Sequence, residues 1–375
     1  MRRLPQRRDG SNQLSTANDS GLSDARDFYA LLRFEEAALG LRTAFQLDLV
    51  DRIGSRALTT LEVQDEFQFT PQATRTFGAL LKVMQVIEPA DSDHWRVTGP
   101  ARNCLASEAE FTRRPYLAMG AHPEVETFVD LLQGKCDASS PALYGREGDA
   151  ETLMDAEEVA QAVSFGLASR AKCFAQPLAR AISSQACPEL TTLADIGAGS
   201  PYVASGCRQL MPQLTATKLV DRANGMRYVR QMLAASRESE KDFELCEQDF
   251  FQSVPTADIY SISNTAHDWL ESEYLEIMTH VREAISREGL VCIHEPLLVT
   301  GWKTREEWQE ALWMACYAVT LFRLTHGKGS CYTVEEHDQI QQRAGFSRSA
   351  DPIRTVDGCT ALFYSLAAAD QDSTS

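Results

Sequence analysis

The residues best suited to acid–base chemistry lie in the second half of this 375-residue chain. The stretch "SISNTAHDWL" (261–270) places His267 and Asp268 side by side, directly after a short apolar run. A neutral imidazole can take a proton from an acidic hydroxyl, because its ordinary pKa lies near neutrality. The other interpretation is an ordinary polar residue at the end of a strand. The local spacing does not decide between the two.

A glycine-containing turn precedes this stretch. In "LADIGAGSPY" (193–202) an apolar segment ends at Asp195 and is followed by Gly197 and Gly199. Glycines allow a tight turn with positive φ and a close approach of the backbone to a ligand. Asp221 ends the next apolar run, at the distance downstream expected of an acid that binds ribose hydroxyls. Taken alone, the turn also fits a plain strand–helix connection.

Two features favour adenosine without phosphates over a dinucleotide. Pro201 and Tyr202 stand where the third glycine of the dinucleotide fingerprint would open the helix, which disfavours a pyrophosphate at that N-terminus. Asp249 in "EQDFF" follows the third predicted strand, and its carboxylate can accept a hydrogen bond from an adenine amino group. The sequence therefore predicts S-adenosylmethionine as the cofactor, with Phe250 beside Asp249 as a further contact.

The elements that position these residues alternate along the second half of the chain. Short apolar runs separated by amphipathic helical segments indicate βαβ units and a parallel sheet. The predicted strands are "LTTLADI", "TATKLVD", "FELCEQ", "ADIYSI" and "GLVCIHE". We predict an α/β fold with a Rossmann-like domain over 188–368. A helical connector over 109–187 precedes it and contributes to an acceptor pocket, and a tail over 369–375 follows.

The N-terminal part, over 22–108, is predicted to be mostly helical. Three helical segments and a hairpin in "IEPADSDHWRVT" predict a winged helix, with Thr59 or Thr60 capping one helix and Thr70 capping the next. The supposed recognition helix carries few cations, whereas a helix that reads a DNA groove needs several. We therefore expect a packing or dimerisation module rather than a DNA-binding one.

Charge and composition exclude several classes of partner. The net charge of −17 disfavours nucleic acid, and the chain has no apolar run long enough to span a membrane. The ten cysteines form no CxxC pair and no zinc-ligand spacing, which predicts reduced thiols and no metal site. Residues 1–21 carry four arginines and form either a disordered tail or part of a transit peptide. The predicted location is cytoplasmic, or an organelle if the transit-peptide interpretation holds.

Six short motifs make the chain similar to a known family. In order they are "DIGAG", Asp221, "QDFF", "HDW", "HEPLL" and "RAGF". They resemble the caffeate and acetylserotonin O-methyltransferases, a branch of the Rossmann-like class I methyltransferases. The N-terminal part resembles the winged-helix dimerisation domain of that family. The resemblance implies S-adenosylmethionine as methyl donor, a small-molecule acceptor and a homodimer.

The resemblance also implies roles for the acid–base residues. His267 would deprotonate the acceptor hydroxyl and Glu295 would orient the imidazole. Asp268 is a further catalytic candidate, or else part of the cofactor wall. The family has a second glutamate in a loop similar to GKERT. This chain has "HGKGSCYT" there, with Ser330 and Cys331 in place of that support.

The acceptor side is predicted from the helix in "EEWQEALWMACYAVTLFRLTHGKG". Arg323 and His326 near its end could hold an acceptor carboxylate, or could simply complement the helix C-terminus. Trp313 on this helix and Tyr144 in "LYGREGD" are further acceptor-contact candidates. O-methylation is the first expectation.

Two alternatives to O-methylation remain open. One is S-methylation of a thioether acid such as 4-methylthio-2-hydroxybutyrate, in dimethylsulfoniopropionate biosynthesis, which needs no general base because a thioether carries no proton. It would account for both the missing glutamate and a carboxylate clamp. The remoter one is a non-catalytic dimeric regulator of the same fold.

Overall fold

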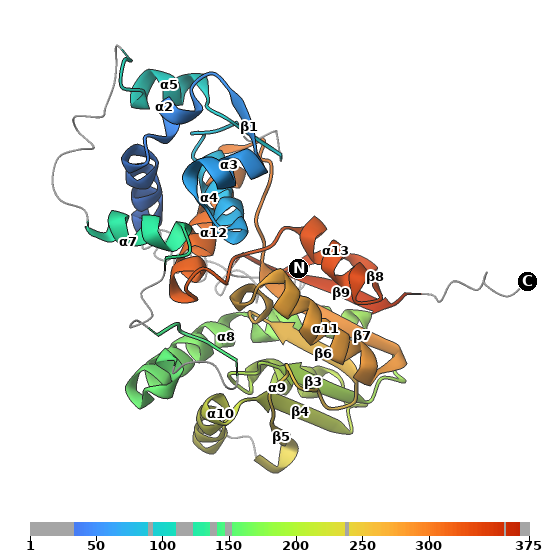
Figure 1. The fold of residues 1–375 in the computed structure, drawn as a ribbon. Coiled ribbons are helices and arrows are strands. Elements are labelled where there is room, and N and C mark those ends of the chain that lie inside the picture. Colours follow the sequence, from blue (N-terminus) through green and yellow to red (C-terminus); the bar gives the residue numbers. More distant parts are fainter. Residues whose placement is uncertain are drawn as a thin grey trace, which may run out of the picture.

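The structure is a computed structural model that describes residues 34–88, 93–109, 123–135, 141–146, 152–236, 240–355 and 358–367. The predicted tails over 1–21 and 369–375 lie outside these ranges. A mostly helical N-terminal part packs against one end of a larger part built on a seven-stranded sheet (Figure 1). No helix in these ranges is long and apolar enough to cross a membrane.

The central sheet confirms the predicted α/β fold. Its order is β5-β4-β3-β6-β7-β9-β8, and the pairs from β5 to β7 are all parallel, whereas β9 is antiparallel to both neighbours. The strands are β3 (Thr192–Ile196), β4 (Ala216–Asp221), β5 (Glu244–Glu247), β6 (Ala257–Ser263), β7 (Ile285–Pro296), β8 (Phe346–Arg354) and β9 (Cys359–Leu366). The first five overlap the five predicted strands, with ends that differ by a few residues; the β8–β9 hairpin was not predicted.

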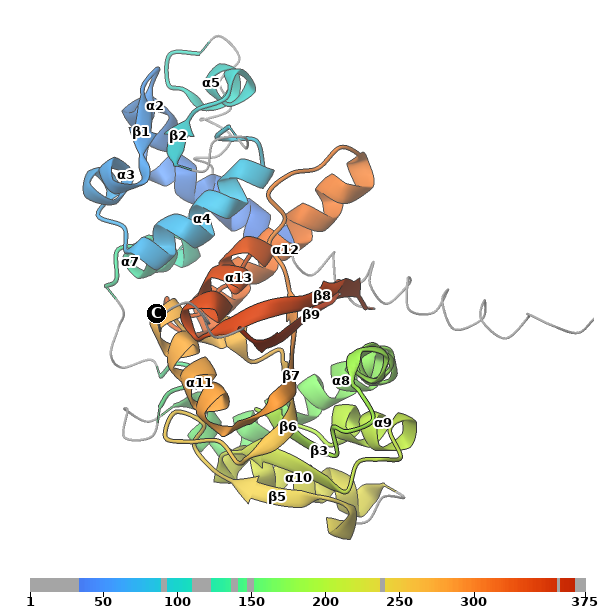
Figure 2. The same ribbon diagram turned by 90° about the vertical axis from the view of Figure 1, so that its right-hand side faces the viewer.

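Helices cover both faces of this sheet (Figure 2). Leu193 of β3 lies in a core with one set of helices, whereas its neighbour Ala194 lies in a second core with another set. The strands are apolar on both faces because both are buried in this way. The first set is α8 (Glu157–Gln185), α9 (Tyr202–Leu210) and α10 (Ala223–Ala235), and the second is α11 (Glu271–Ala284) and α13 (Val334–Arg343).

Capping residues set the helix boundaries of the N-terminal part. Thr59 forms a capping box with Glu62 at the start of α3 (Thr60–Phe67), and Thr70 caps α4 (Pro71–Val83), which has proline at its first position. The other elements are a helix over 34–46, α2 (Leu49–Ile53), β1 (Ala57–Thr59), β2 (His94–Arg96), α5 (Gly99–Leu105) and α7 (Pro123–Leu132).

The predicted N-terminal hairpin is present in part. Ile87 and Val97 form an antiparallel bridge, and the turn at 89–92 lies outside the described residues. The strand β2, however, pairs mainly with β1, which was not predicted as a strand. The winged-helix and homodimer assignments stay predictions.

Helix α12 (Arg305–Leu324) belongs to the core of the N-terminal part, although it lies within the predicted catalytic domain. Its apolar residues, including Leu312, Val319 and Phe322, share one buried cluster with Phe77 and Leu80 of α4. Figure 2 shows α12 crossing between the two parts of the molecule. Helix α12 therefore links the N-terminal part, in whose core it packs, to the part that contains the sheet.

Candidate active site

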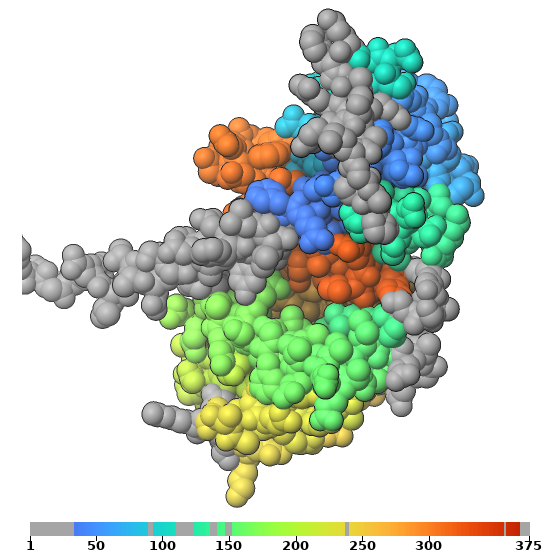
Figure 3. All heavy atoms as spheres, turned by 90° about the vertical axis from the view of Figure 1, so that its left-hand side faces the viewer, coloured from blue at the N-terminus to red at the C-terminus, as the bar shows by residue number. Residues whose placement is uncertain are grey.

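A cavity of about 380 Å³ opens at the carboxyl ends of β3 and β6. This is the point where the strand order reverses direction, and open α/β sheets bind ligands at such points. Helices α8 and α12 supply the opposite wall, and a smaller cavity of about 120 Å³ adjoins it at the end of β4. In Figure 3 the green surface of α8 lies directly beside an orange-red patch from the C-terminal third of the chain.

The glycine turn after β3 lies between the two cavities. Gly197 has φ 66° and Gly199 has φ 55°, a region that favours glycine. A Cβ atom on Gly197 would lie 2.6 Å from Oγ1 of Thr265, so this position requires glycine for space as well. Both glycines line both cavities, and the backbone of the turn can thus approach a ligand closely.

Asp221, at the end of β4, lines the smaller cavity. Its Oδ2 accepts a hydrogen bond from Gly199 N (3.0 Å), and Oδ1 accepts one from Arg222 N (2.8 Å). Burial raises the pKa of this carboxyl, and the two backbone donors partly offset that effect. Each oxygen keeps a second lone pair. Asp221 therefore both braces the glycine turn and can accept two ribose hydroxyls.

The other predicted cofactor residues divide into two groups. Asp195 lines the larger cavity and Phe250 lines the smaller one. Asp249 lies on the lining of neither; its carboxylate accepts a hydrogen bond from Phe251 N (3.0 Å) within its own turn. The adenine-binding role predicted for Asp249 is not supported by this position.

Asp195 is buried, and its pKa rises to about 7 because burial disfavours the charge and the charge of Asp221 adds to it. Between its ordinary pKa of 3.8 and about 7, the folded state holds a proton that the unfolded state releases. Stability should therefore fall as pH rises through this window.

Asp195→Asn is accordingly expected to raise the melting temperature at about pH 8 more than at about pH 5, as measured by thermal unfolding. Asp258→Asn at the opposite end of the sheet is a matched control. Burial of Asp258 is outweighed by hydrogen bonds from Thr192 and Thr191, so its pKa is lowered. Because both pH values lie above the range in which Asp258 titrates, that substitution should lower the melting temperature by about the same amount at each. A pH-independent difference for Asp195→Asn would contradict this account.

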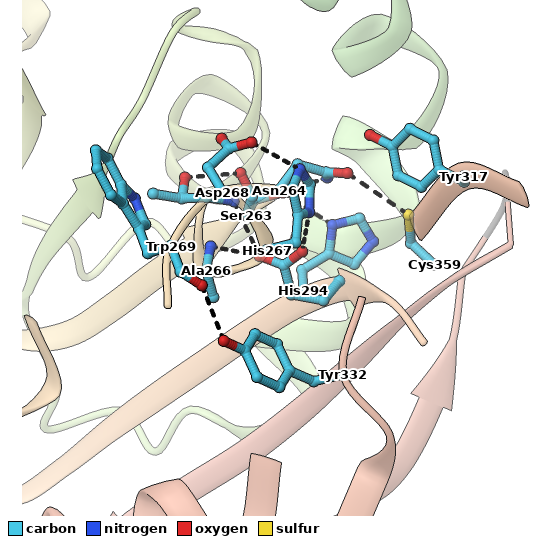
Figure 4. Close-up of polar contacts among 12 residues, drawn as sticks. Ser263, Asn264, Ala266, His267, Asp268, Trp269, His294, Tyr317, Tyr332 and Cys359 are labelled. Atoms are coloured by element: carbon cyan, nitrogen blue, oxygen red, sulfur yellow. Dashed lines mark hydrogen bonds and ion pairs between the residues drawn. The ribbon is translucent and has the colours of Figure 1, made fainter. Parts of the chain in front are cut away.

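His267, which Figure 4 shows beside Asp268, forms a buried pair with Glu295. Nδ1 of His267 contacts Oε2 of Glu295, and Oε1 of Glu295 accepts hydrogen bonds from Thr265 N (2.9 Å) and Ala266 N (2.8 Å). Burial opposes the charged imidazole, but the charges of Glu295 and Asp268 outweigh it and raise the pKa of His267. Glu295 thus holds one ring nitrogen, while His267 itself lines the larger cavity.

Asp268 lines both cavities and lies next to the other ring nitrogen. Its Oδ1 is 3.7 Å from Nε2 of His267. Burial raises the pKa of Asp268 to about 7, against the opposing charge of His267. Burial therefore favours the neutral form of this carboxyl more than water does.

Three further side chains complete the larger cavity. Tyr144 lines it as predicted, and Arg170 and Tyr317 were not predicted. Arg170 Nη1 donates to the hydroxyl of Tyr317 (3.2 Å), whose ring lies edge-to-face with His267 at 5.8 Å. A signal for Arg170 did exist. Val163, Arg170 and Phe174 share one face of α8 at helical spacing, and an arginine on such an apolar stripe marks a cavity.

The structure does not bring Trp313, Arg323 or His326 to this cavity. The face of α12 that does line it carries Tyr317, Leu321 and Leu324. Arg323 points to another side, where its Nη1 donates to both oxygens of Glu36 (2.8 and 3.0 Å). It borders a separate outer cavity together with His326. The acceptor role predicted for these three residues is not supported by their positions.

Comparison with known proteins completes this description. A family model described as an O-methyltransferase domain matches residues 131–347, more than half of the chain. The chain belongs to the O-methyltransferase family. The matched region includes the strand ends that line the two cavities, as well as the pair of His267 and Glu295. The resemblance seen in the sequence motifs is therefore confirmed.

Curated relatives of this chain match over part of their length. The chain is 23% identical to scoulerine-9-O-methyltransferase 3 of Papaver somniferum over 218 residues, which is 58% of each chain. It is 29% identical to acetylserotonin O-methyltransferase of Gallus gallus over 157 residues, which is 42% of each chain. The chain thus spans three fifths or less of these relatives' length.

Solved structures share the fold over nearly the whole chain. An O-methyltransferase family 2 protein from Planctomyces limnophilus, solved with apigenin, has a TM-score of 0.73 at 19% identity, covering 91% of this chain and 95% of that one. Human N-acetylserotonin methyltransferase, solved with S-adenosylmethionine, has a TM-score of 0.50 at 16% identity, covering 96% and 100%. These likenesses show the fold.

S-adenosylmethionine is the cofactor of this family, and the residues present fit it. Gly197 has no room for a Cβ atom, and the backbone of its turn can therefore approach the cofactor closely. Asp221 has lone pairs that can accept hydrogen bonds from ribose hydroxyls. Asp195, Asp268 and Arg170 line the larger cavity, where the two carboxyls would offer a counter-charge to a sulfonium and the arginine would offer a cation to a carboxylate. Among the described residues, no group of three or more His, Cys, Asp or Glu side chains could hold a metal ion.

Proposed function

We propose that this protein transfers a methyl group from S-adenosylmethionine to a hydroxyl oxygen of a small, largely apolar acceptor, with His267 as general base. The supporting observation is the buried pair of His267 and Glu295 at the wall of the larger cavity. Leucine, valine, alanine and aromatic side chains outnumber the polar and charged ones on the rest of that wall. Such a lining suits an aromatic or aliphatic acceptor with few polar groups.

The residues of this chain divide the work as follows. S-adenosylmethionine, when bound, supplies an electrophilic methyl group. The imidazole Nε2 of His267 faces away from Glu295 and accepts the hydroxyl proton. Glu295 keeps Nδ1 protonated and stabilises the imidazolium that results. Because the pKa of His267 is raised, activity should increase with pH through a value above 6.5 as the free base forms.

Neither the comparisons nor the cavity supplies an observation that favours a thioether acceptor. The predicted carboxylate clamp of Arg323 is occupied by Glu36. Arg170 is the cation on the cavity lining, and the carboxylate of the cofactor offers it a partner without any acidic acceptor. Oxygen is therefore the acceptor atom that we propose.

Transfer of a labelled methyl group onto a panel of phenols and alcohols tests the proposal. The expected result is a labelled ether from at least one apolar hydroxyl acceptor, at a rate that rises with pH. Titration calorimetry with S-adenosylmethionine, performed on the same protein, should show heat of binding. No transfer to any member of the panel would overturn the proposal, and no heat of binding would show in addition that the protein does not bind the cofactor.

A further inference from the structure

The loop between α12 and α13 lies against the catalytic histidine through its backbone. Ser330 N donates a hydrogen bond to the carbonyl oxygen of His267 (2.8 Å). The approach is close, because a Cβ atom on Gly329 would lie 2.7 Å from that same oxygen. Two residues further on, the hydroxyl of Tyr332 donates to the carbonyl of Trp269 (2.9 Å) (Figure 4). The loop thus holds the main chain on both sides of Asp268.

The same loop is held on its other side by α4 of the N-terminal part. The hydroxyl of Thr76 donates to the hydroxyl of Ser330 (2.9 Å), and both side chains are buried. Gln72 Nε2, one helical turn earlier, donates to the carbonyl of Lys328 (2.9 Å). Gln72 and Thr76 are four residues apart and therefore lie on the same face of α4, which contacts the loop through both hydrogen bonds.

Arg75, which lies between Gln72 and Thr76 in α4, makes further contacts with the loop. Its guanidinium makes a bidentate ion pair with Glu336 of α13 (2.7 and 2.8 Å) and donates to the carbonyl of Cys331. It also lies 4.4 Å from the centre of the Tyr332 ring. The bidentate geometry fixes orientation as well as distance. Loop residues 328–332 are therefore fixed in place by the N-terminal part.

We infer that α4 is a positioning element for the general base, acting through the contact of Thr76 with Ser330 and of Ser330 with His267. The inference rests on the proposed function in its account of what His267 does. A base must lie within hydrogen-bond reach of the proton it takes, and a displacement of about 1 Å can cost about a hundredfold in rate. Helix α4 touches neither cavity, so its effect passes through the loop.

The chain offers a matched control on the same helix. Thr74 is also buried, but its hydroxyl donates to the carbonyl of Thr70 within α4 (3.0 Å). Thr74→Val and Thr76→Val therefore remove the same atom from the same helix, and only the second breaks the contact with Ser330. Thr76→Ser keeps the hydroxyl and should rescue. Ser330→Ala tests the contact from the loop side if Thr76→Val does not fold.

The decisive measurement is the pKa of His267 in the full chain, followed by NMR of imidazole nitrogens and assigned with His267→Gln. In Thr76→Val and Ser330→Ala we expect that pKa to fall by about half a unit or more, because the ring moves from Glu295. We expect kcat to fall about tenfold, with KM and cofactor affinity within about twofold of wild type. Thr74→Val and Thr76→Ser should match wild type.

An unchanged His267 pKa in folded Thr76→Val and Ser330→Ala would overturn the inference. So would an equal loss of kcat in Thr74→Val, which would show a general effect of destabilising α4. The imidazole titration needs no acceptor. If no methyl transfer is found, the proposed function fails while this measurement still decides whether α4 positions His267.

Discussion

Replacing His267 with glutamine is expected to lower kcat by about 10²–10⁴-fold, which is the usual contribution of a positioned general base. Glutamine keeps a polar side chain of similar length but cannot accept and hold a proton at neutral pH. The rise of activity with pH should disappear in the same variant, since the titrating group is gone. Steady-state kinetics across the pH range measure both effects.

Calorimetry and a second histidine separate chemistry from folding. His267→Gln should bind S-adenosylmethionine with nearly wild-type affinity, because the glycine turn and Asp221 are untouched. His337→Gln is a suitable control: His337 is equally buried, contacts Tyr274 and lines neither cavity. It should lose stability but retain kcat within about threefold. Comparable loss of kcat in both variants would contradict the assignment of His267.

Replacing Asp221 with alanine is expected to weaken S-adenosylmethionine binding by about 10²–10⁴-fold, as measured by titration calorimetry, because two hydrogen bonds are lost. Hydrogen bonds to a charged group contribute about 1.5–3 kcal/mol each, and about 1.4 kcal/mol is tenfold in affinity. The substitution also leaves Gly199 N without its acceptor, which loosens the turn. The space around the Asp221 carboxylate is narrow, because a Cβ atom on Gly225 would lie 2.5 Å from Oδ1 of Asp221.

Asp258→Ala is the matched control for Asp221→Ala. Asp258 belongs to the same sheet and also accepts hydrogen bonds from backbone amides, those of Thr191 and Thr192 (both 3.0 Å). It lies at the opposite end of the strands, away from the cavities. Its loss should lower the melting temperature and leave cofactor affinity within about twofold. Wild-type affinity in Asp221→Ala would show that the cofactor binds elsewhere.

Residues at strand ends could be predicted from the sequence because the apolar run that forms each strand lies directly before them. Apolar runs define β3 and β4, so Gly197, Gly199 and Asp221 fall at their carboxyl edge whatever the rest of the chain does. His267 comes shortly after the end of β6, and Glu295 lies near the end of β7. These two strands are neighbours in the sheet. Their contact follows from strand order and from the motifs that the family shares.

Residues on helices were predicted less well because their direction depends on packing. Arg323 and Tyr317 both lie on α12, and the sequence does not show which residues of this helix pack in the N-terminal core and which also line the cavity. Tyr317 faces the cavity, whereas Arg323 pairs with Glu36 from far earlier in the chain. Arg170 reaches the cavity only because α8 crosses the ends of the strands. Long-range contacts of this kind leave little trace in local spacing.

The loop "HGKGSCYT" shows a further limit of sequence analysis. Its departure from the family motif indicated a loss of support for His267. In the structure, Ser330 N donates to the main-chain carbonyl of His267, and the Ser330 side chain contacts Thr76 of α4. Local sequence could not predict the side-chain contact, because it joins residues 254 apart in the chain.

The most direct test of the account is a competition between oxygen and sulfur acceptors. The wild-type protein would be given S-adenosylmethionine carrying a ¹³C-labelled methyl group, together with an apolar phenol and a thioether acid at equal concentration, and the products followed by NMR. The account predicts label on oxygen, at a rate that increases with pH as His267 loses its proton. Label on sulfur, at a rate independent of pH, would contradict it.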